Sequence, residues 1–135
     1  MDRTAVEAWI DAYRRAWSSD DPAEIAALFT EDVSYSPFPW PRDERTWRGR
    51  DLVVRKWIER GDSKATWRFE HEILAVDGDT AVIEGWTYYG PTDETPHEDA
   101  YANIWVVRFA DDGRARSFAE WWVQRPLPEE HRASA

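Results

Sequence analysis

The chain of 135 residues contains no cysteine and only three histidines. Without cysteine it can form neither disulfides nor thiolate metal sites, and a reducing compartment such as the cytoplasm is the expected location. The histidines, His71, His97 and His131, stand at spacings that match no helical or hairpin metal motif. We therefore expect a cytoplasmic protein with no metal centre, and any chemistry it performs should need no cofactor.

Basic residues are also scarce, since 17 Lys and Arg stand against 27 Asp and Glu and the net charge is -10. Binding to phosphate backbones requires clustered positive charge, so a nucleic acid is excluded as the principal partner. No apolar run approaches the length that crosses a membrane, and no basic segment followed by an apolar stretch opens the chain. The length fits one domain, which we place at residues 1–126, before a polar, flexible tail at 127–135.

Tryptophan, in contrast, is abundant. Ten indoles occur, at Trp9, Trp17, Trp40, Trp47, Trp57, Trp67, Trp86, Trp105, Trp121 and Trp122. Protein interiors tolerate few voids, yet large rigid plates seldom fit together without gaps. A ligand pocket or a subunit interface should therefore take up part of this aromatic surface.

Three amphipathic segments in the first half of the chain predict helices. The first begins at Thr4, where Glu7 completes a capping box, and the second follows Asp21 as N-cap. The third begins at Arg50 and ends at Gly61, because glycine readily adopts the left-handed geometry that closes a helix.

The remaining segments predict a sheet. A short strand at Val33 to Pro37 precedes a proline-containing loop from Pro37 to Thr46, and whether this loop acts as a lid stays open. From Thr66 onward the apolar period changes to two, which predicts four antiparallel strands at about Thr66 to Val76, Thr80 to Tyr89, Glu98 to Phe109 and Arg114 to Gln124. Helices first and a long meander behind them indicate an α+β domain whose strongly bent antiparallel sheet wraps the helices.

The turns set which side chains share a face. A two-residue turn at Asp77-Gly78 would place Trp67 near Tyr88, Phe69 near Trp86 and His71 near Glu84. In the last hairpin, a two- or four-residue turn would place Tyr101, Asn103 and Trp105 on the face that carries Phe118, Glu120 and Trp122. A three-residue turn would reverse that second register and put Trp121 in place of Glu120.

Glu120 interrupts the apolar pattern of the last strand, because Phe118 and Trp122 flank it at two-residue spacing. A buried carboxylate costs free energy unless it is hydrogen-bonded or protonated. Two interpretations stay open. Glu120 either lines a cavity with a raised pKa suited to acid–base work, or it pairs with Arg116, Arg108 or Asn103 as part of the structure.

Several segments together resemble a known family. They are the first helix with Tyr13, Ser18 to Asp21, Ile25 to Phe29 followed by Glu31 to Val33, Trp47 to Gly49, and Asn103 to Phe109 followed by Asp112-Gly113. With them the chain resembles the NTF2-like superfamily, and within it the SnoaL-like and ketosteroid-isomerase-like small domains, from about Thr4 to Gln124. The superfamily includes isomerases, dehydratases, epoxide hydrolases, polyketide cyclases and transport factors, so the resemblance implies a fold more than a reaction.

The resemblance implies a cone in which a bent sheet and three helices enclose a cavity. It implies that Tyr13 donates a hydrogen bond to a developing oxyanion, and that Asn103 or Trp105 lies near the family's second donor. In the ketosteroid isomerases the general base lies in the strand after the second helix, where Val33 to Pro37 offers no carboxylate. Steroid-type proton transfer is therefore not implied.

Two functional hypotheses follow. In the first, the chain is an isomerase, dehydratase or cyclase acting on a hydrophobic cyclic compound. Glu120 or His71 would move the proton, while Tyr13 and Asn103 would polarise an oxygen. His71 has a structural alternative, an imidazole held against Glu84. The pocket walls would be Trp40, Trp57, Trp67, Trp86, Tyr101, Trp105 and Trp122. In the second hypothesis the same walls only bind an apolar metabolite.

Self-association is a further expectation. The outer face of the last two strands is also apolar, through Ala102, Ile104, Val106, Ala119, Trp121 and Val123. A sheet that is apolar on both faces needs two covers, and the helices supply one. We expect a second copy of the chain to supply the other, in a homodimer with two-fold symmetry.

Overall fold

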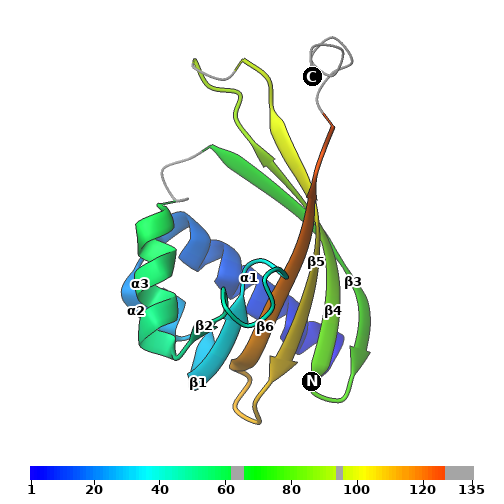
Figure 1. Cartoon of the computed structure of the whole chain (residues 1–135). Helices are drawn as coiled ribbons and strands as arrows, with labels where there is room; N and C mark the ends of the chain where they lie inside the picture. Colours follow the sequence, from blue (N-terminus) through cyan, green and yellow to red (C-terminus); the bar gives the residue numbers. More distant parts are fainter. Residues whose placement is uncertain (62–65, 94–95, 127–135) are drawn as a thin grey trace.

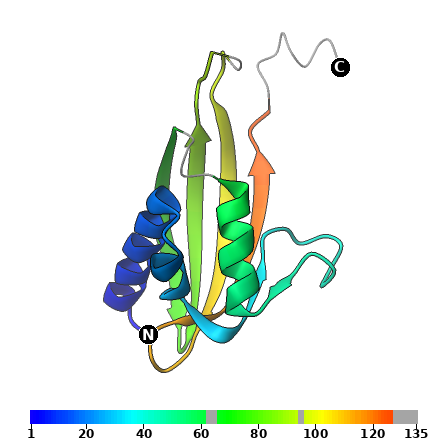
Figure 2. The same cartoon turned by 90° about the vertical axis from the view of Figure 1, so that its left-hand side faces the viewer.

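The chain folds into three helices and six strands in a computed structural model that describes residues 1–61, 66–93 and 96–126. The predicted tail at 127–135 lies outside the described residues. The helices are α1 (Arg3–Ser19), α2 (Pro22–Ala26) and α3 (Arg50–Arg60), and the strands are β1 (Phe29–Ser36), β2 (Trp47–Arg48), β3 (Trp67–Asp77), β4 (Thr80–Tyr89), β5 (Asp99–Phe109) and β6 (Ala115–Gln124). All three helices lie on one side of a curved sheet (Figures 1 and 2). The predicted α+β architecture is confirmed.

The strand order is β2-β1-β6-β5-β4-β3. Strands β3 to β6 form the predicted antiparallel meander, but β1 pairs with β6 in parallel, so the sheet is mixed. Tyr35 of β1 lies beside Phe118 of β6 in this pair. Periodicity in the sequence identifies strands and neighbouring hairpins, and it carries no information on such a distant pairing.

The helix ends follow local chemistry. The N-cap of α1 is Asp2, whose side chain accepts a hydrogen bond from the Ala5 amide at 2.8 Å, so the predicted cap at Thr4 is wrong. A carboxylate also interacts favourably with the positive end of the helix dipole, which favours the earlier start. The other two predictions are confirmed, since Asp21 caps α2 and Gly61 closes α3 at φ 66°.

The β3–β4 register differs from the prediction. Asp77 pairs with Thr80, so the turn residues are Gly78 and Asp79 instead of Asp77 and Gly78. A bulge between Ile73 and Ala75 then shifts the pairing back by one residue, which leaves it one residue away from the predicted register. Phe69 consequently lies opposite Thr87, and His71 lies opposite Gly85. Trp86 and Glu84 therefore face the outer side of the sheet, because a shift of one residue moves a side chain to the other face.

The β5–β6 register is the one expected from a two- or four-residue turn, but it arises in another way. The Ala110 amide donates to the Arg114 carbonyl around a three-residue turn, which alone would turn Glu120 outward. An irregularity between Ala115 and Ser117 adds one residue to β6 and reverses that effect. Trp105 therefore lies opposite Glu120, and Asn103 lies opposite Trp122.

The concave face is filled differently along its length. Near the β5–β6 turn, Trp9 of α1 packs against Phe109 and Phe29, and its indole N–H donates to the Leu28 carbonyl at 3.1 Å. Val6 and Ile10 are completely buried beside it. We call this region the closed half of the concave face. Towards the other end, the strands extend beyond the helices (Figure 1).

The convex face carries no helix in the described part of the chain (Figure 1). Apolar side chains are exposed there, with Trp121 at 47% and Val123 at 70% of their possible accessible surface. Within the described ranges, no helix is both long and apolar enough to span a membrane.

Candidate functional site

A pocket of about 200 Å³ lies between the helices and the concave face, beyond the closed half. Its described lining is Tyr13, Trp17, Tyr35, Pro37, Trp47, Trp57, Arg60, Thr87, Tyr89, Tyr101, Asn103, Trp105, Glu120 and Trp122. Nine of these fourteen side chains are Trp or Tyr, so any guest meets mainly aromatic surface. The few polar groups then decide which atoms of a guest are stabilised.

Two tyrosines meet in the wall of the pocket. The hydroxyl oxygens of Tyr13 (α1) and Tyr35 (β1) lie 2.7 Å apart, and both side chains are buried. Because one hydroxyl donates to the other, the pair keeps one further O–H proton for a third group. Tyr35 is held by stacking on Trp47 at 5.0 Å and on Phe118 at 4.5 Å. The position of this hydroxyl pair is therefore fixed by packing.

The pKa of Tyr13 is raised well above 10.0, first by burial and then by the neighbouring Tyr35 and Glu120. The positive charge of Arg60 acts in the opposite direction without cancelling these effects. The phenol is therefore protonated at neutral pH and can serve as a hydrogen-bond donor.

The carboxylate of Glu120 is held by an indole. Trp105 is 2% exposed, and its Nε1–H donates to Glu120 Oε2 at 2.6 Å. A hydrogen bond this short fixes the orientation of the carboxylate. The ring of Trp105 also lies 4.6 Å from that of Tyr13. The structure thus brings a potential proton acceptor next to a potential donor.

Two further polar side chains lie in the sheet. The Thr87 hydroxyl donates to Asn103 Oδ1 at 3.0 Å, and both residues are buried.

At the rim of the pocket, the ring of Trp122 contacts Tyr101 at 5.6 Å and Phe38 at 5.5 Å between ring centroids. The loop from Pro37 to Thr46 therefore reaches the pocket through its first residues.

Of the four predicted catalytic residues, Tyr13, Asn103 and Glu120 line the pocket and His71 does not. Arg14 donates to His71 Nδ1 at 2.8 Å, so the ring proton resides on Nε2 and is donated to Glu7 at 2.9 Å. The predicted partner Glu84 is wrong, because it faces the other side of the sheet opposite Glu72. His71 ties α1 to β3.

The predicted aromatic walls divide in the same way. Trp57, Tyr101, Trp105 and Trp122 line the pocket. Trp67 stands behind the wall, where it stacks on Trp17 at 4.1 Å. Trp40 is 67% exposed on the loop, and the shifted register turns Trp86 outward.

Sequence reasoning missed four lining residues with polar groups, Tyr35, Tyr89, Thr87 and Arg60. Tyrosine and threonine are ordinary strand residues, so neither breaks the alternating pattern as Glu120 does. Arg60 ends α3 and looks like a solvated terminal cation. Only the parallel β1–β6 pair, which the sequence does not reveal, could have indicated Tyr35.

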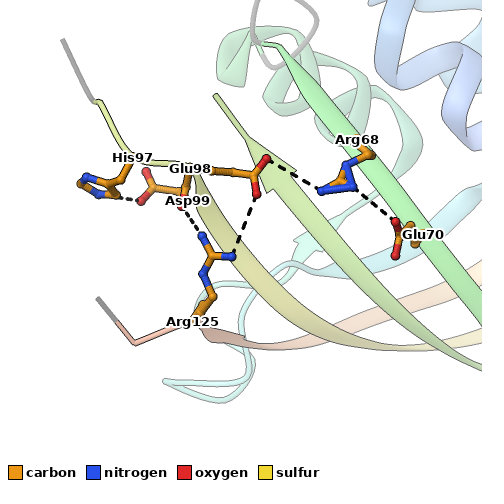
Figure 3. Close-up of polar contacts among 6 residues, drawn as sticks. All are labelled: Arg68, Glu70, His97, Glu98, Asp99 and Arg125. Atoms are coloured by element: carbon orange, nitrogen blue, oxygen red, sulfur yellow. Dashed lines mark hydrogen bonds and ion pairs between the residues drawn. The ribbon is translucent and has the colours of Figure 1, made fainter. Parts of the chain in front are cut away.

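Charged side chains outside the pocket form ion pairs near the far end of the sheet. Arg68 contacts Glu70 at 3.4 Å and Glu98 at 3.8 Å, and Arg125 contacts Glu98 at 4.0 Å (Figure 3). The network joins β3, the start of β5 and the end of β6. Among the residues that the structure describes, no group of three or more His, Cys, Asp or Glu is arranged to hold a metal ion.

Comparison with known proteins places the chain in a family. The sequence profile of the SnoaL-like domain matches residues 6–118. No curated protein matches the chain.

Solved structures share the fold. A protein of unknown function with a cystatin-like fold from Methylobium petroleophilum PM1 superposes with a TM-score of 0.70 at 19% identity, over 96% of this chain and 82% of that one. An LEH-like epoxide hydrolase from Mycobacterium tuberculosis gives 0.63 at 17% identity, over 89% and 84%. SalBIII, described as an epoxide hydrolase/cyclase-like enzyme in pyran ring formation in the polyether salinomycin, gives 0.68 at 17% identity, over 90% and 93%.

Proposed function

This chain belongs to the SnoaL-like domain family, and from that premise we propose that it is a cofactor-free acid–base catalyst. The proposed reaction is an isomerisation, dehydration or cyclisation of a small hydrophobic cyclic compound held in the aromatic pocket. By analogy, two structural neighbours support ring-containing substrates, since one is described as an LEH-like epoxide hydrolase and the other as an epoxide hydrolase/cyclase-like enzyme.

The observation that carries the proposal is the position of Glu120 beside the hydroxyl pair. Its carboxylate is fixed by Trp105 at 2.6 Å, and its charge is close enough to contribute to the raised pKa of Tyr13. A base and a hydrogen-bond donor on the same side of an aromatic pocket are the two groups that enolisation and elimination require.

In this proposal Glu120 removes a proton from a carbon next to an electron-withdrawing oxygen function. The O–H of the Tyr13–Tyr35 pair stabilises the negative charge that develops on that oxygen, and the Asn103 amide supplies an N–H donor to another part of the substrate. The aromatic walls exclude water, which strengthens both interactions. In an isomerisation, Glu120 then returns the proton to another carbon. In a dehydration, the protonated Glu120 gives it to the departing hydroxyl, which leaves as water.

Base-promoted ring opening of 5-nitrobenzisoxazole tests the base directly. A carboxylate takes the C3 proton, the N–O bond breaks, and the electron pair ends on the phenolate oxygen of 2-cyano-4-nitrophenol, which absorbs visible light. We expect the wild-type protein to accelerate this reaction, and Glu120→Gln to lose about 100-fold of the acceleration. Gln can still accept the Trp105 N–H, so the pocket should stay intact.

The matched control is Glu72→Gln, which removes an exposed carboxylate on the outer face of β3. It should keep the wild-type rate. If Glu120→Gln binds the probe, as followed by tryptophan fluorescence, and opens it as fast as the wild type, the acid–base proposal fails. The pocket is then better described as a binding module for an apolar metabolite.

We also propose that a second copy of the chain covers the convex face. Trp121 and Val123 are exposed at 47% and 70%, and Ile104 lies opposite Trp121 in the same surface. A self-complementary apolar patch favours a two-fold dimer. Light scattering at micromolar concentration should give twice the chain mass for the wild type and the chain mass for Trp121→Asp. A monomeric wild type would contradict this proposal.

A further inference from the structure

Thr87 and Asn103 are the only non-aromatic polar side chains in the described part of the chain that are buried, at 4% and 6% exposure. They come from neighbouring strands, β4 and β5, and both line the pocket. Polar groups placed in an aromatic wall lose their contact with water. They are stabilising only where each donor and acceptor finds a partner.

The bond between these two residues fixes the direction of the amide. Because the Thr87 hydroxyl donates to Asn103 Oδ1 at 3.0 Å, the amide oxygen is turned toward Thr87 and the nitrogen away from it. Within the described ranges, Asn103 Nδ2 has no hydrogen-bond partner. The wall therefore presents an N–H donor, oriented by Thr87, to whatever occupies the pocket.

This donor is separate from the tyrosine pair. Trp105, whose ring contacts Tyr13, is two residues further along β5 than Asn103. Two residues of a strand span about 6.6 Å, which is roughly the width of a substituted benzene ring. One ring compound can therefore place an oxygen at each of the two donors.

The size of the pocket limits the rest of the molecule. A pocket of about 200 Å³ is larger than the roughly 150 Å³ cavity that holds benzene. It is smaller than the roughly 300–1,000 Å³ typical of sites for drug-sized ligands. One or two fused rings fit this volume.

We propose that the pocket selects a one- or two-ring compound with two separate acceptor oxygens, one bound by the Tyr13–Tyr35 pair and one by the Asn103 amide. Thr87 is the positioning residue that makes this part of the wall recognise an acceptor. The inference rests on the proposed function, because it describes the substrate class of the same pocket. The tyrosine pair serves the reacting oxygen, and the Asn103 subsite holds the opposite end of the ring.

A matched pair of probes tests the second acceptor. 1,4-Diacetylbenzene has a carbonyl at each end of the ring, and 4-isopropylacetophenone has the same number of heavy atoms with one carbonyl oxygen replaced by a methyl group. Quenching of tryptophan fluorescence gives the dissociation constant of each. We expect Asn103→Leu to reduce the wild-type preference for the diketone by about tenfold, the effect of one hydrogen bond.

The Thr87 variants separate positioning from folding. Thr87→Val removes the hydroxyl with little change in shape, and it should lose part of the diketone preference while binding 4-isopropylacetophenone normally. Thr87→Ser keeps the hydroxyl and should keep the preference. Thr80→Val makes the same change on β4 at the far end of the strand, where the hydroxyl bonds Asp79, and should leave the preference unchanged.

Each outcome decides a different point. If both probes bind and Asn103→Leu and Thr87→Val leave their ratio unchanged, the acceptor subsite is wrong while the proposed acid–base function stands. If neither probe binds to the wild type, the pocket does not take ring compounds of this size and the inference is overturned. Loss of 5-nitrobenzisoxazole ring opening in Glu120→Gln is measured independently, so the two proposals fail separately.

Discussion

The two halves of the concave face are built from the same strands, but one half is filled core and the other is a pocket. Along β5 the inward side chains run from Phe109 and Val107 in the closed half to Trp105, Asn103 and Tyr101 in the pocket. In the closed half, Trp9 and its neighbours on α1 fill the space above the strands. In the other half the strands extend beyond the helices, and aromatic side chains surround a space that they do not fill.

Aromatic content alone therefore does not decide whether a region becomes core or pocket. The deciding factor is how completely helix side chains fill the space opposite the strand at that height, because apolar rings need a partner within about 4.5 Å to lose their contact with water. Polar groups appear where the packed core ends and the pocket begins. On β6, the buried Phe118 is followed two residues later by Glu120, which lines the pocket. The change from core to site takes place within one step of the strand.

The largest expected effect comes from the closed half. Phe109→Ala should lower the free energy of unfolding by about 3–5 kcal/mol, because the cavity beside Trp9 cannot collapse. Trp122→Ala, at a residue that is 38% exposed at the pocket rim, should cost about 1 kcal/mol or less and should weaken binding of 4-isopropylacetophenone. Urea denaturation measures the stability of both variants. Equal losses of stability would contradict the distinction between the two halves.

The second effect lies at the boundary. A Cβ added at Gly85 would stand 2.5 Å from Cε1 of Phe69, whose ring stacks on Trp105 at 4.9 Å. Gly85→Ala should therefore cost about 1–3 kcal/mol through overcrowding. It should also slow the opening of 5-nitrobenzisoxazole, because displacement of Trp105 moves Glu120.

Phe69→Leu supplies the control for this boundary, since it removes the ring that would clash. The double variant Gly85→Ala, Phe69→Leu should be more stable than the sum of the two single changes predicts. Strict additivity would show that Gly85 does not define the boundary.

The smallest effect concerns the pocket phenol. The pKa of Tyr13 is raised above 10.0 by burial, so the unfolded chain loses this proton at a lower pH than the folded one. The stability gained by keeping the phenol neutral is complete below about pH 10 and is lost as the pH rises further. Above that pH, the wild type should lose up to about 1.4 kcal/mol per pH unit more than Tyr13→Phe. Urea denaturation between pH 9 and 11 tests this, and identical slopes would contradict it.

Much of the fold could be predicted, because helix caps and strand periods are local signals. Gly61 and the bounds of β4 are as expected. The β3–β4 register could not be predicted, since the bulge near Leu74 has no glycine or proline to indicate it. A second irregularity, at Arg116, places Glu120 on the inner face although the turn has three residues. The sequence left this face open, and the turn length alone would have indicated the outer face.

Residues of the candidate site could be predicted only where they depart from the apolar alternation of a strand. Glu120 stood out because a carboxylate occupies an apolar position, and structure gives it an indole partner that no charge-based search would propose. Tyr35 and Thr87 obey the strand pattern, so their roles depend on three-dimensional neighbours alone. His71 looked equally promising in the sequence and lies outside the pocket, bonded to Arg14 and Glu7.

The parallel pairing of β1 with β6 has a consequence for biosynthesis. Tyr35 leaves the ribosome before the strand that supports it, with Phe118 and Glu120, has been made. No nascent fragment that lacks β6 can assemble the hydroxyl pair beside its carboxylate. A nascent chain that ends before β6 should therefore be unable to bind its guest, and binding should arise in one step when β6 docks.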